Sequence, residues 1–217
     1  MSGMINGLFP GNIKPTETLA GCIDVYEGIW NNPLQTIEDV EKECLDVNSD
    51  LHWSRAETLG SGYDQNHRTN YNMGITYHAN LGSSVAQKIH NKVHMNLLAT
   101  TIDYNKRYGV EDRLWHEEYN MLKYSSGQEY YPHYDGGTGS GRSLSAIIYL
   151  NDNYEGGHIE FVNFKIKIKP TPGTLFLFPS NYAYRHTAHP VTSGTKYAIV
   201  TWLHDRPIEN RREHGVE

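Results

Sequence analysis

The sequence predicts an α+β fold in which N-terminal helices pack on one sheet of a β-sandwich or jelly roll. Two segments in the first 112 residues show helical spacing of apolar side chains, and from about residue 113 eight short β-like runs alternate with glycine and proline. Sixteen tyrosines also favour β structure. A length of 217 residues suits a single domain. We expect a helix and loop support region at 1–112, a jelly-roll core at 113–205 and a charged tail at 206–217.

The first helix is expected within residues 31–47, NNPLQTIEDVEKECLDV. An asparagine followed by Pro33 is a typical helix start. Four side chains then recur at the spacing of one helical face: Leu34, Ile37, Val40 and Cys44. The polar segment 60–72, GSGYDQNHRTNYN, has no such period. We expect a long mobile loop there, which is an element that often covers a binding site.

A second, longer helix is expected within residues 83–109. Ser83 or Ser84 can cap its start, and Gly109 can end it. Its apolar stripe consists of Val85, Ile89, Val93, Leu97 and Ile102. Because only one face of this helix is apolar, we expect it to lie against a sheet.

Eight strands are expected in the second half of the chain. The alternation in KIKIK, at 165–169, indicates a strand with one solvated face, whereas AIIYL and TLFLF are typical of strands buried on both faces. The expected strands are 117–124, 128–135, 143–151, 157–164, 165–169, 173–178, 183–188 and 196–203. Short strands at regular spacing are typical of sandwiches and jelly rolls.

Composition limits the classes of partner. The formal net charge of -6 and the lack of long basic runs argue against nucleic acid or an anionic membrane as the main partner. No run of apolar residues is long enough to span a membrane, and the N-terminus does not resemble a signal peptide, so we expect a cytoplasmic protein. Cys22 and Cys44 are expected as two reduced, partly buried thiols.

Residues 136–143, GGTGSGRS, resemble the phosphate-binding loop of nucleotide hydrolases except that Arg142 replaces the lysine. That loop requires a buried strand before it and a helix after it, with the helix N-terminus facing the phosphates. Here the preceding segment is polar and aromatic, and the following segment SLSAIIYL is strand-like. We therefore interpret 136–143 as a connection between two strands.

A different chemistry is indicated just before this connection. Residues i and i+2 of a strand project from the same face, so His133 and Asp135 can bind one metal ion together. The same spacing occurs twice elsewhere, in His116 with Glu118 and in His158 with Glu160. His90 and His94 lie one helical turn apart, as in zinc proteases, although the glutamate of H-E-x-x-H is missing.

A catalytic site with two histidines and one carboxylate needs a third ligand from elsewhere in the chain. His186 is a candidate, and Lys196 follows ten residues later in another strand-like run. A lysine that points inward would require an anionic partner, which implies a ligand that carries a carboxylate. The alternative is that Lys196 begins an exposed strand edge.

Taken together, these residues resemble the Fe(II)- and 2-oxoglutarate-dependent oxygenases, and most closely the prolyl 4-hydroxylase group. That group has H-x-D, a distal histidine and a basic residue about ten positions later. The likeness extends over roughly residues 115–203 and includes EYNMLKYSSGQEYYPHYD, EGGHIEFVNFKIKIKPTPGTLFLFPS and HPVTSGTKYAIVTW. In the pattern H-x-x-x-P-V the ligand lies four residues before the proline, so the resemblance selects His186 rather than His189.

The resemblance implies a double-stranded β-helix, a form of jelly roll, with Fe(II) held by His133, Asp135 and His186. It implies that Lys196 and Tyr149 bind the distal carboxylate of 2-oxoglutarate, with Tyr124 nearby, and that dioxygen is the co-substrate and ascorbate a possible reductant. Arg142 and Trp202 lie where relatives line the approach to the iron. The implied reaction hydroxylates a C–H bond, most readily in a prolyl residue of a peptide or protein. The alternatives are a non-prolyl substrate and a non-catalytic module that keeps a metal for structure.

Overall fold

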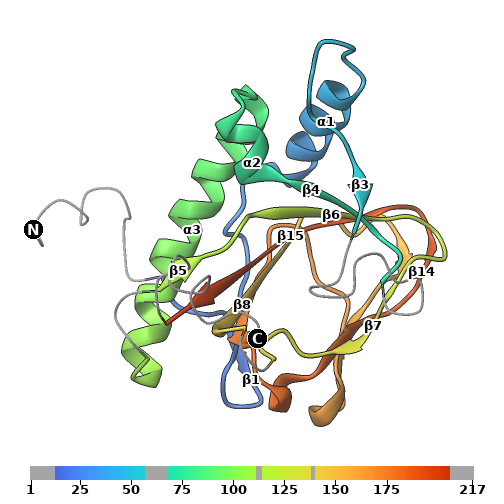
Figure 1. Ribbon diagram of the computed structural model, residues 1–217. Coiled ribbons are helices and arrows are strands. Elements are labelled where there is room, and N and C mark those ends of the chain that lie inside the picture. The colour runs from blue at the N-terminus through green and yellow to red at the C-terminus, as the bar shows by residue number, and fades with distance from the viewer. Residues whose placement is uncertain (1–12, 57–67, 111–113, 138–139, 206–217) are drawn as a thin grey trace, which may run out of the picture.

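The computed structural model describes residues 13–56, 68–110, 114–137 and 140–205. Two antiparallel sheets form the body of the molecule, and the helices lie against the outer face of the larger sheet (Figure 1). The predicted jelly-roll core with helices on one sheet is confirmed. The tail at 206–217 and residues 60–67 of the predicted loop lie outside the described residues.

Three helices form the outer layer: α1 (Pro33–Cys44), α2 (Ile75–Asn80) and α3 (Ser84–Tyr108). The Ser83 hydroxyl accepts a hydrogen bond from the Ala86 amide at the start of α3, as an N-cap does. The helix ends at Gly109, whose φ of 65° lies in the left-handed region that favours glycine. Both predicted helices are confirmed, whereas the short α2 was not predicted.

The buried face of α3 has a helical period, but only some of its residues are the predicted ones. Ile89, Val93 and Leu97 pack on the larger sheet. Ile102, however, is 50% exposed, and the buried positions continue instead at Thr100 and Tyr104. Steps of three and four residues keep a helical stripe on one face, whereas the step of five from residue 97 to 102 leaves it. The assignment of Ile102 to the stripe was therefore wrong.

The larger sheet has nine strands in the order β1-β2-β12-β8-β15-β6-β4-β3, with β5 paired to the end of β15. They are β1 (Glu17–Leu19), β2 (Ile23–Tyr26), β3 (Ser54–Arg55), β4 (Tyr71–Gly74), β5 (Trp115–His116), β6 (Asn120–Tyr124), β8 (Arg142–Tyr149), β12 (Leu175–Pro179) and β15 (Lys196–His204). The smaller sheet has the order β11-β10-β13-β7, with β7 (Tyr130–His133), β10 (Ile159–Phe161), β11 (Ile166–Ile168) and β13 (His186–Ala188). A separate pair consists of β9 (Glu155–Gly156) and β14 (Val191–Ser193).

Each of the eight predicted runs contains a strand, although 157–164 ends in a 3-10 turn, Val162–Phe164, and 183–188 begins in another, Tyr182–Tyr184. Four strands, β1 to β4, come from the N-terminal part of the chain and were not predicted. Tyr71 and Asn72 were expected in a loop but belong to β4, because β4 pairs with β6 about fifty residues later. Pairing with a distant strand thus overrides the polar local sequence.

Strand alternation separates two cores. In β12, Leu175 and Leu177 face the helices, whereas Phe176 and Phe178 face the smaller sheet, where they meet Phe161 of β10. The same alternation in β6, β8 and β15 directs four side chains toward the smaller sheet: Tyr124, Ser145, Tyr149 and Lys196. The interior between the two sheets therefore receives polar groups from the centre of the larger sheet.

Two further observations concern the sequence expectations. Cys22 and Cys44 are free and half-buried, as expected. Within the residues that the structure describes, none of the helices has both the length and the apolar character that crossing a membrane requires.

Candidate active site

Sheet register brings three candidate metal ligands together. His133 ends β7, His186 begins β13, and the two are directly opposite in the ladder between these strands. Their ring centroids lie 4.4 Å apart. Asp135 places one carboxylate oxygen 3.4 Å from Nε2 of His133 and the other 3.7 Å from Nε2 of His186. Among the described residues, this candidate triad is the one group of His, Cys, Asp and Glu whose ligand atoms all converge within 4.8 Å.

Both imidazoles present Nε2 to the candidate triad because Nδ1 is engaged elsewhere. Nδ1 of His133 lies 2.7 Å from the backbone oxygen of Tyr131, and Nδ1 of His186 lies 3.1 Å from that of Tyr184. A carbonyl oxygen can only accept, so each Nδ1 donates its proton, and in the neutral ring the lone pair is on Nε2. Metal-binding histidines are fixed in this way by a hydrogen bond from the second ring nitrogen.

Asp135 lies in an environment that keeps it ionised. Burial raises its pKa, but His186, His133 and the Ser145 hydroxyl outweigh burial and hold the pKa well below its usual range. Ser145 Oγ donates to Asp135 Oδ2 at 2.6 Å and lies 2.8 Å from the hydroxyl of Ser180. Burial, aided by His133, lowers the pKa of His186 to about 4, so this imidazole is neutral at pH 7 and available to a metal.

Lys196 is a buried amino group with no carboxylate partner in the described part of the chain. The residue is 2% exposed, and Nζ donates to the backbone oxygen of Gly157 at 2.6 Å. Burial lowers its pKa to about 7. Of the two alternatives for Lys196, the structure shows the inward-facing one. A buried ammonium is costly unless an anion accompanies it, so this position favours an anionic ligand.

Tyr124 and Tyr149 lie on either side of Lys196. Each ring centroid is 5.2 Å from Nζ, and both side chains line the narrow pocket that the candidate triad also borders. Burial raises the pKa of Tyr124 to about 12 and that of Tyr149 well above its usual value, so both hydroxyls remain protonated donors. Neither hydroxyl has a protein partner among the described residues, which leaves both available to a ligand.

The structure places Trp202 beside this pocket and Arg142 behind it. Arg142 forms a two-point ion pair with Glu117, at 2.8 and 2.6 Å, and its guanidinium carbon lies 3.6 Å from the Trp202 ring centroid. Burial raises the pKa of Glu117, but Arg142 and His204 outweigh it and the pKa falls to about 2. Trp202 lines the pocket, and its Nε1 is buried without a hydrogen-bond partner. Arg142 also donates to the backbone oxygen of Asp135 at 3.4 Å, so it contacts two residues of the pocket without lining it.

Sequence reasoning missed two pocket residues. Tyr130 stacks on His133 with ring centroids 3.6 Å apart, and Arg68 forms a β-bridge to Tyr130. The Arg68 guanidinium carbon lies 4.8 Å from the Tyr130 ring centroid, and both residues line the pocket. Tyr130 had a weak signal, since it precedes His133 in the same predicted strand. Arg68 had only a general signal, since it lies in the polar segment 60–72, which was expected to be of a kind that often covers a binding site; its contacts come from a segment distant in sequence.

The competing histidine and carboxylate pairs have other partners. His189 Nε2 lies 2.6 Å from Glu160, so neither residue belongs to the candidate triad, and the pair of Glu160 with His158 is not formed. Glu118 accepts hydrogen bonds from the amides of Thr76 and Tyr77 at the start of α2. The geometry therefore agrees with the choice of His186 over His189.

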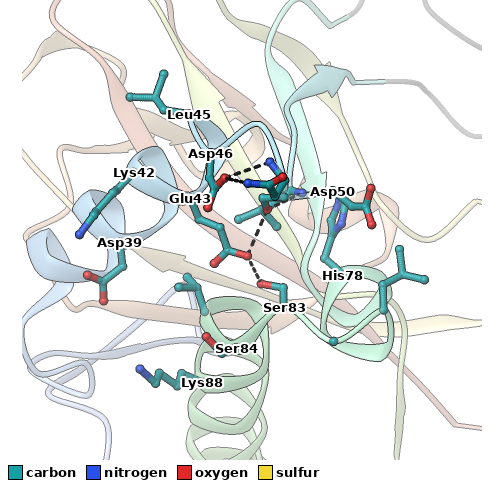
Figure 2. A pocket seen from close by; sticks show the side chains of 16 residues that line it. Asp39, Lys42, Glu43, Leu45, Asp46, Asp50, His78, Ser83, Ser84 and Lys88 are labelled. Carbon is teal, nitrogen blue, oxygen red and sulfur yellow. Dashed lines mark hydrogen bonds between the residues drawn. The ribbon is translucent and has the colours of Figure 1, made fainter.

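A larger cavity, of about 820 Å³, lies between α1, α2 and the start of α3 (Figure 2). Some of its polar groups bond to one another, although Nδ1 of His78 is buried without a hydrogen-bond partner among the described residues. Glu43 accepts hydrogen bonds from the hydroxyls of Ser49 and Ser83, and Asp46 accepts from the backbone and side-chain amides of Asn48. The converging ligand atoms and the unpaired Lys196 lie in the narrow pocket instead, which is why we place the candidate site there.

Residues 119–204 match the family model described as the 2OG-Fe(II) oxygenase superfamily. The matched stretch contains the candidate triad, both pocket tyrosines and Lys196. The expected resemblance to this superfamily is confirmed over these residues.

Similar curated proteins are prolyl 4-hydroxylases. Prolyl 4-hydroxylase subunit alpha-1 of Gallus gallus is 33% identical over 114 residues, which are 44% of this chain and 22% of that protein. Probable prolyl 4-hydroxylase 9 of Arabidopsis thaliana is 30% identical over 122 residues, which are 43% of this chain and 42% of the relative. The chain thus spans less than half the length of these relatives.

Similar solved structures share the fold over most of the chain. A prolyl hydroxylase of Trichoplax adhaerens, in complex with a hypoxia inducible factor peptide, has a TM-score of 0.70 and 18% identity, and covers 91% of this chain and 89% of its own. A viral collagen prolyl hydroxylase from Paramecium Bursaria Chlorella virus-1, in a 2OG complex, has a TM-score of 0.57 and 23% identity, with coverages of 87% and 98%. At these identities the likeness shows the jelly-roll fold alone.

The residues of the pocket fit the superfamily's Fe(II) and 2-oxoglutarate. Two imidazoles and one carboxylate are the donor set of non-haem Fe(II) oxygenases. The unpaired amino group of Lys196, with two tyrosine hydroxyls beside it, suits the distal carboxylate of 2-oxoglutarate. Both ends of the keto acid thus have a candidate partner in the same pocket.

Proposed function

We propose that the chain is an Fe(II)- and 2-oxoglutarate-dependent dioxygenase that hydroxylates a prolyl residue in a peptide or protein. The observation that carries the proposal is Lys196, a buried amino group that has no carboxylate partner in the described part of the chain and lines the same pocket as His133, Asp135 and His186. A structural metal site has no use for such a group, because it is closed by protein ligands. A dicarboxylate co-substrate accounts for both features.

Each pocket residue has a role in this proposal. His133, Asp135 and His186 hold Fe(II), which when bound supplies the activation of dioxygen coupled to decarboxylation of 2-oxoglutarate. Lys196 and Tyr149 bind the distal carboxylate of the keto acid. Ser145 holds the Asp135 carboxylate in place through its hydroxyl.

The apolar walls of the pocket exclude water around these groups. Leu122, Ile147 and Val200 line it together with the tyrosine rings. Exclusion of water strengthens the attraction between Lys196 and a carboxylate and suppresses side reactions of bound intermediates. Trp202 lies at the same pocket with a buried, unpaired Nε1, which can donate to a carbonyl oxygen of a peptide substrate.

The prolyl substrate is supported by the relatives. Prolyl 4-hydroxylases are the curated proteins that resemble the chain, and the Trichoplax adhaerens structure was determined with a peptide. Ascorbate as a reductant, the absence of nucleic acid and membrane partners, and the cytoplasmic location remain predictions.

The proposal is tested under anaerobic conditions first. Protein with Fe(II) and 2-oxoglutarate should develop the weak visible charge-transfer band of a chelated keto acid, and the Lys196→Met variant should require far more 2-oxoglutarate for the same band. Air and a library of proline-containing peptides should then yield succinate and peptides heavier by one oxygen atom on proline.

Three outcomes separate the alternatives. Succinate with oxygen on another residue type would retain the dioxygenase and reject the prolyl substrate. A charge-transfer band with no product from any peptide would move the search to small molecules. No band and no succinate would overturn the proposal and favour a module that keeps a metal for structure.

A further inference from the structure

Three histidines gather on the opposite side of the larger sheet from the candidate triad. His90 and His94 lie one turn apart on α3, and His116 lies in β5 beneath them. Their ring centroids are separated by 6.3 Å (His90 to His94), 6.2 Å (His90 to His116) and 5.5 Å (His94 to His116). We call these three residues the second histidine cluster. It has no role in the proposed oxygenase reaction.

The second histidine cluster leaves one nitrogen of each ring without a partner. Nδ1 of His116 lies 2.8 Å from the backbone oxygen of Glu117, so it donates and Nε2 keeps its lone pair. Nδ1 of His90 lies 3.3 Å from the Thr76 hydroxyl, and Nδ1 of His94 lies 3.1 Å from the Tyr119 hydroxyl. A hydroxyl can accept from either Nδ1. Among the described residues, no Nε2 of the three has a hydrogen-bond partner.

This pattern is the one that prepares histidines for a metal. Metal-binding histidines are oriented by a hydrogen bond from the second ring nitrogen, and here each Nδ1 faces an oxygen that can accept such a bond. Burial lowers the pKa of His90 and of His94, and the neighbouring histidines lower both further, which favours the neutral form that binds metals. The Tyr119 ring packs against the rings of His90 and His116, at centroid distances of 4.9 and 4.4 Å.

Zinc binding at this cluster requires the rings to turn. With zinc–nitrogen bonds of about 2.0–2.1 Å in a tetrahedral site, imidazole centroids lie roughly 5 Å apart. The His90 and His94 rings are stacked and nearly parallel, and the ligand nitrogens of the cluster do not converge within 4.8 Å as those of the candidate triad do. The side chains of His94, which is exposed, and His90, which is half-buried, must therefore rotate to bring the three nitrogens around one ion. Imidazole nitrogen suits Zn²⁺, and three histidines plus water is a known zinc coordination.

We propose that His90, His94 and His116 form a second metal site, which binds Zn²⁺ through their three Nε2 atoms with water in the fourth position. Such an ion joins α3 to β5 and so fastens the helical layer to the larger sheet. This site is independent of the iron site and does not rest on the proposed function.

Zinc stoichiometry tests the proposal, with a chromophoric chelator as competitor. The wild-type protein should bind two equivalents of Zn²⁺, one at the candidate triad and one at the second histidine cluster. The His90→Ala/His94→Ala variant should bind one, and so should the His133→Ala/Asp135→Ala variant. The control is His52→Ala, which removes an exposed histidine outside both sites and should leave two equivalents.

Co²⁺ spectra and thermal unfolding give two further measurements that do not depend on the zinc stoichiometry. Co²⁺ bound to the His133→Ala/Asp135→Ala variant should show visible d–d bands that disappear when His94→Ala is added. Zn²⁺ should raise the thermal unfolding midpoint of the first variant and not of the second. One equivalent in the wild type that is lost in His133→Ala/Asp135→Ala, or two equivalents retained in His90→Ala/His94→Ala, would overturn the proposal and leave the cluster as aromatic packing around Tyr119.

Discussion

The two groups of histidines differ in how far the backbone alone brings their nitrogens together. His133 and His186 are directly opposite in one β-ladder, and their ring centroids lie 4.4 Å apart. His90 and His116 come from a helix and a two-residue strand that meet through side chains, and their centroids lie 6.2 Å apart. Hydrogen bonds between strands fix a distance that helix packing only approximates.

The two groups also differ in charge. The candidate triad includes Asp135, whose carboxylate offsets the positive charge of an ion, whereas the second histidine cluster has imidazoles alone. Carboxylate and imidazole together suit Fe(II) and leave open positions, while imidazole alone suits Zn²⁺. The comparison therefore predicts two sites with different metal preferences on the two faces of one sheet, and each change below breaks or sharpens it.

The largest effect is expected from His186→Ala. Loss of a residue that supports a metal ligand typically reduces metal affinity by about 10- to 100-fold. Loss of a ligand itself should reduce Fe(II) affinity by more than this, as measured by anaerobic titration. Zinc binding at the second histidine cluster should not change. His189→Ala is the matched control, because His189 contacts Glu160 instead of the triad. Equal losses in the two variants would contradict our choice of ligand.

Lys196→Met should chiefly weaken the binding of 2-oxoglutarate. The loss of a charge-assisted hydrogen bond of about 2–3 kcal/mol raises the KM for 2-oxoglutarate by about 100-fold, whereas Fe(II) affinity should be unchanged. Lys123→Met is the control, because Lys123 pairs with Glu41 outside the pocket. An unchanged KM in Lys196→Met would show that the buried amino group does not bind the co-substrate.

Ser145→Ala should have a smaller effect on the same site. It removes the hydroxyl that donates to Asp135 at 2.6 Å, and loss of such a supporting hydrogen bond lowers metal affinity by about 10-fold. The measurement is Fe(II) affinity in competition with a chelator. Ser126→Ala, whose hydroxyl bonds the backbone of Thr192 far from the triad, should behave as the wild type. A full loss of iron binding in Ser145→Ala would mean that the hydroxyl orders the whole site.

The last effect concerns how the stability of the protein without 2-oxoglutarate depends on pH. Burial lowers the pKa of Lys196 to about 7 from its ordinary 10.5, so between these values the unfolded chain binds the proton and the folded chain does not. This group should therefore make the free energy of unfolding rise from pH 7 to about 10.5, by at most about 1.4 kcal/mol per pH unit. Denaturant titrations should show that Lys196→Met lacks this contribution. If the free energy of unfolding rose equally with pH in the wild type and in Lys196→Met, other groups would be responsible for the rise.

The sequence predicted those parts of the fold and site that local patterns encode. The strands around His133 and Lys196 follow from short runs of β-branched and aromatic residues, and the candidate triad follows from the order of the motifs. The ends of α3 follow from Ser83 and Gly109, whose chemistry acts within a few residues.

Long-range contacts account for what the sequence did not predict. β2 is held by β12, which follows it by about 150 residues, and Arg68 reaches the pocket through its bridge to Tyr130. The ion pair of Arg142 with Glu117 likewise joins the start of β8 to the connection between β5 and β6, and Arg142 packs on Trp202; its contact with a substrate stays a prediction. Such contacts depend on which strands are neighbours, and no local pattern specifies that.

Gly157 has a consequence for which keto acids the pocket can accept. Its φ is 61°, and a Cβ there would lie 2.7 Å from the Tyr154 ring and 3.2 Å from Cδ of Lys196. Its carbonyl oxygen also holds Nζ of Lys196, so the amino group is fixed to the backbone at one end of the pocket as firmly as the triad is at the other. Under the proposed function the separation of the two ends is constant. The pocket therefore selects its co-substrate by chain length, and a keto diacid one carbon shorter than 2-oxoglutarate reaches only one of the two.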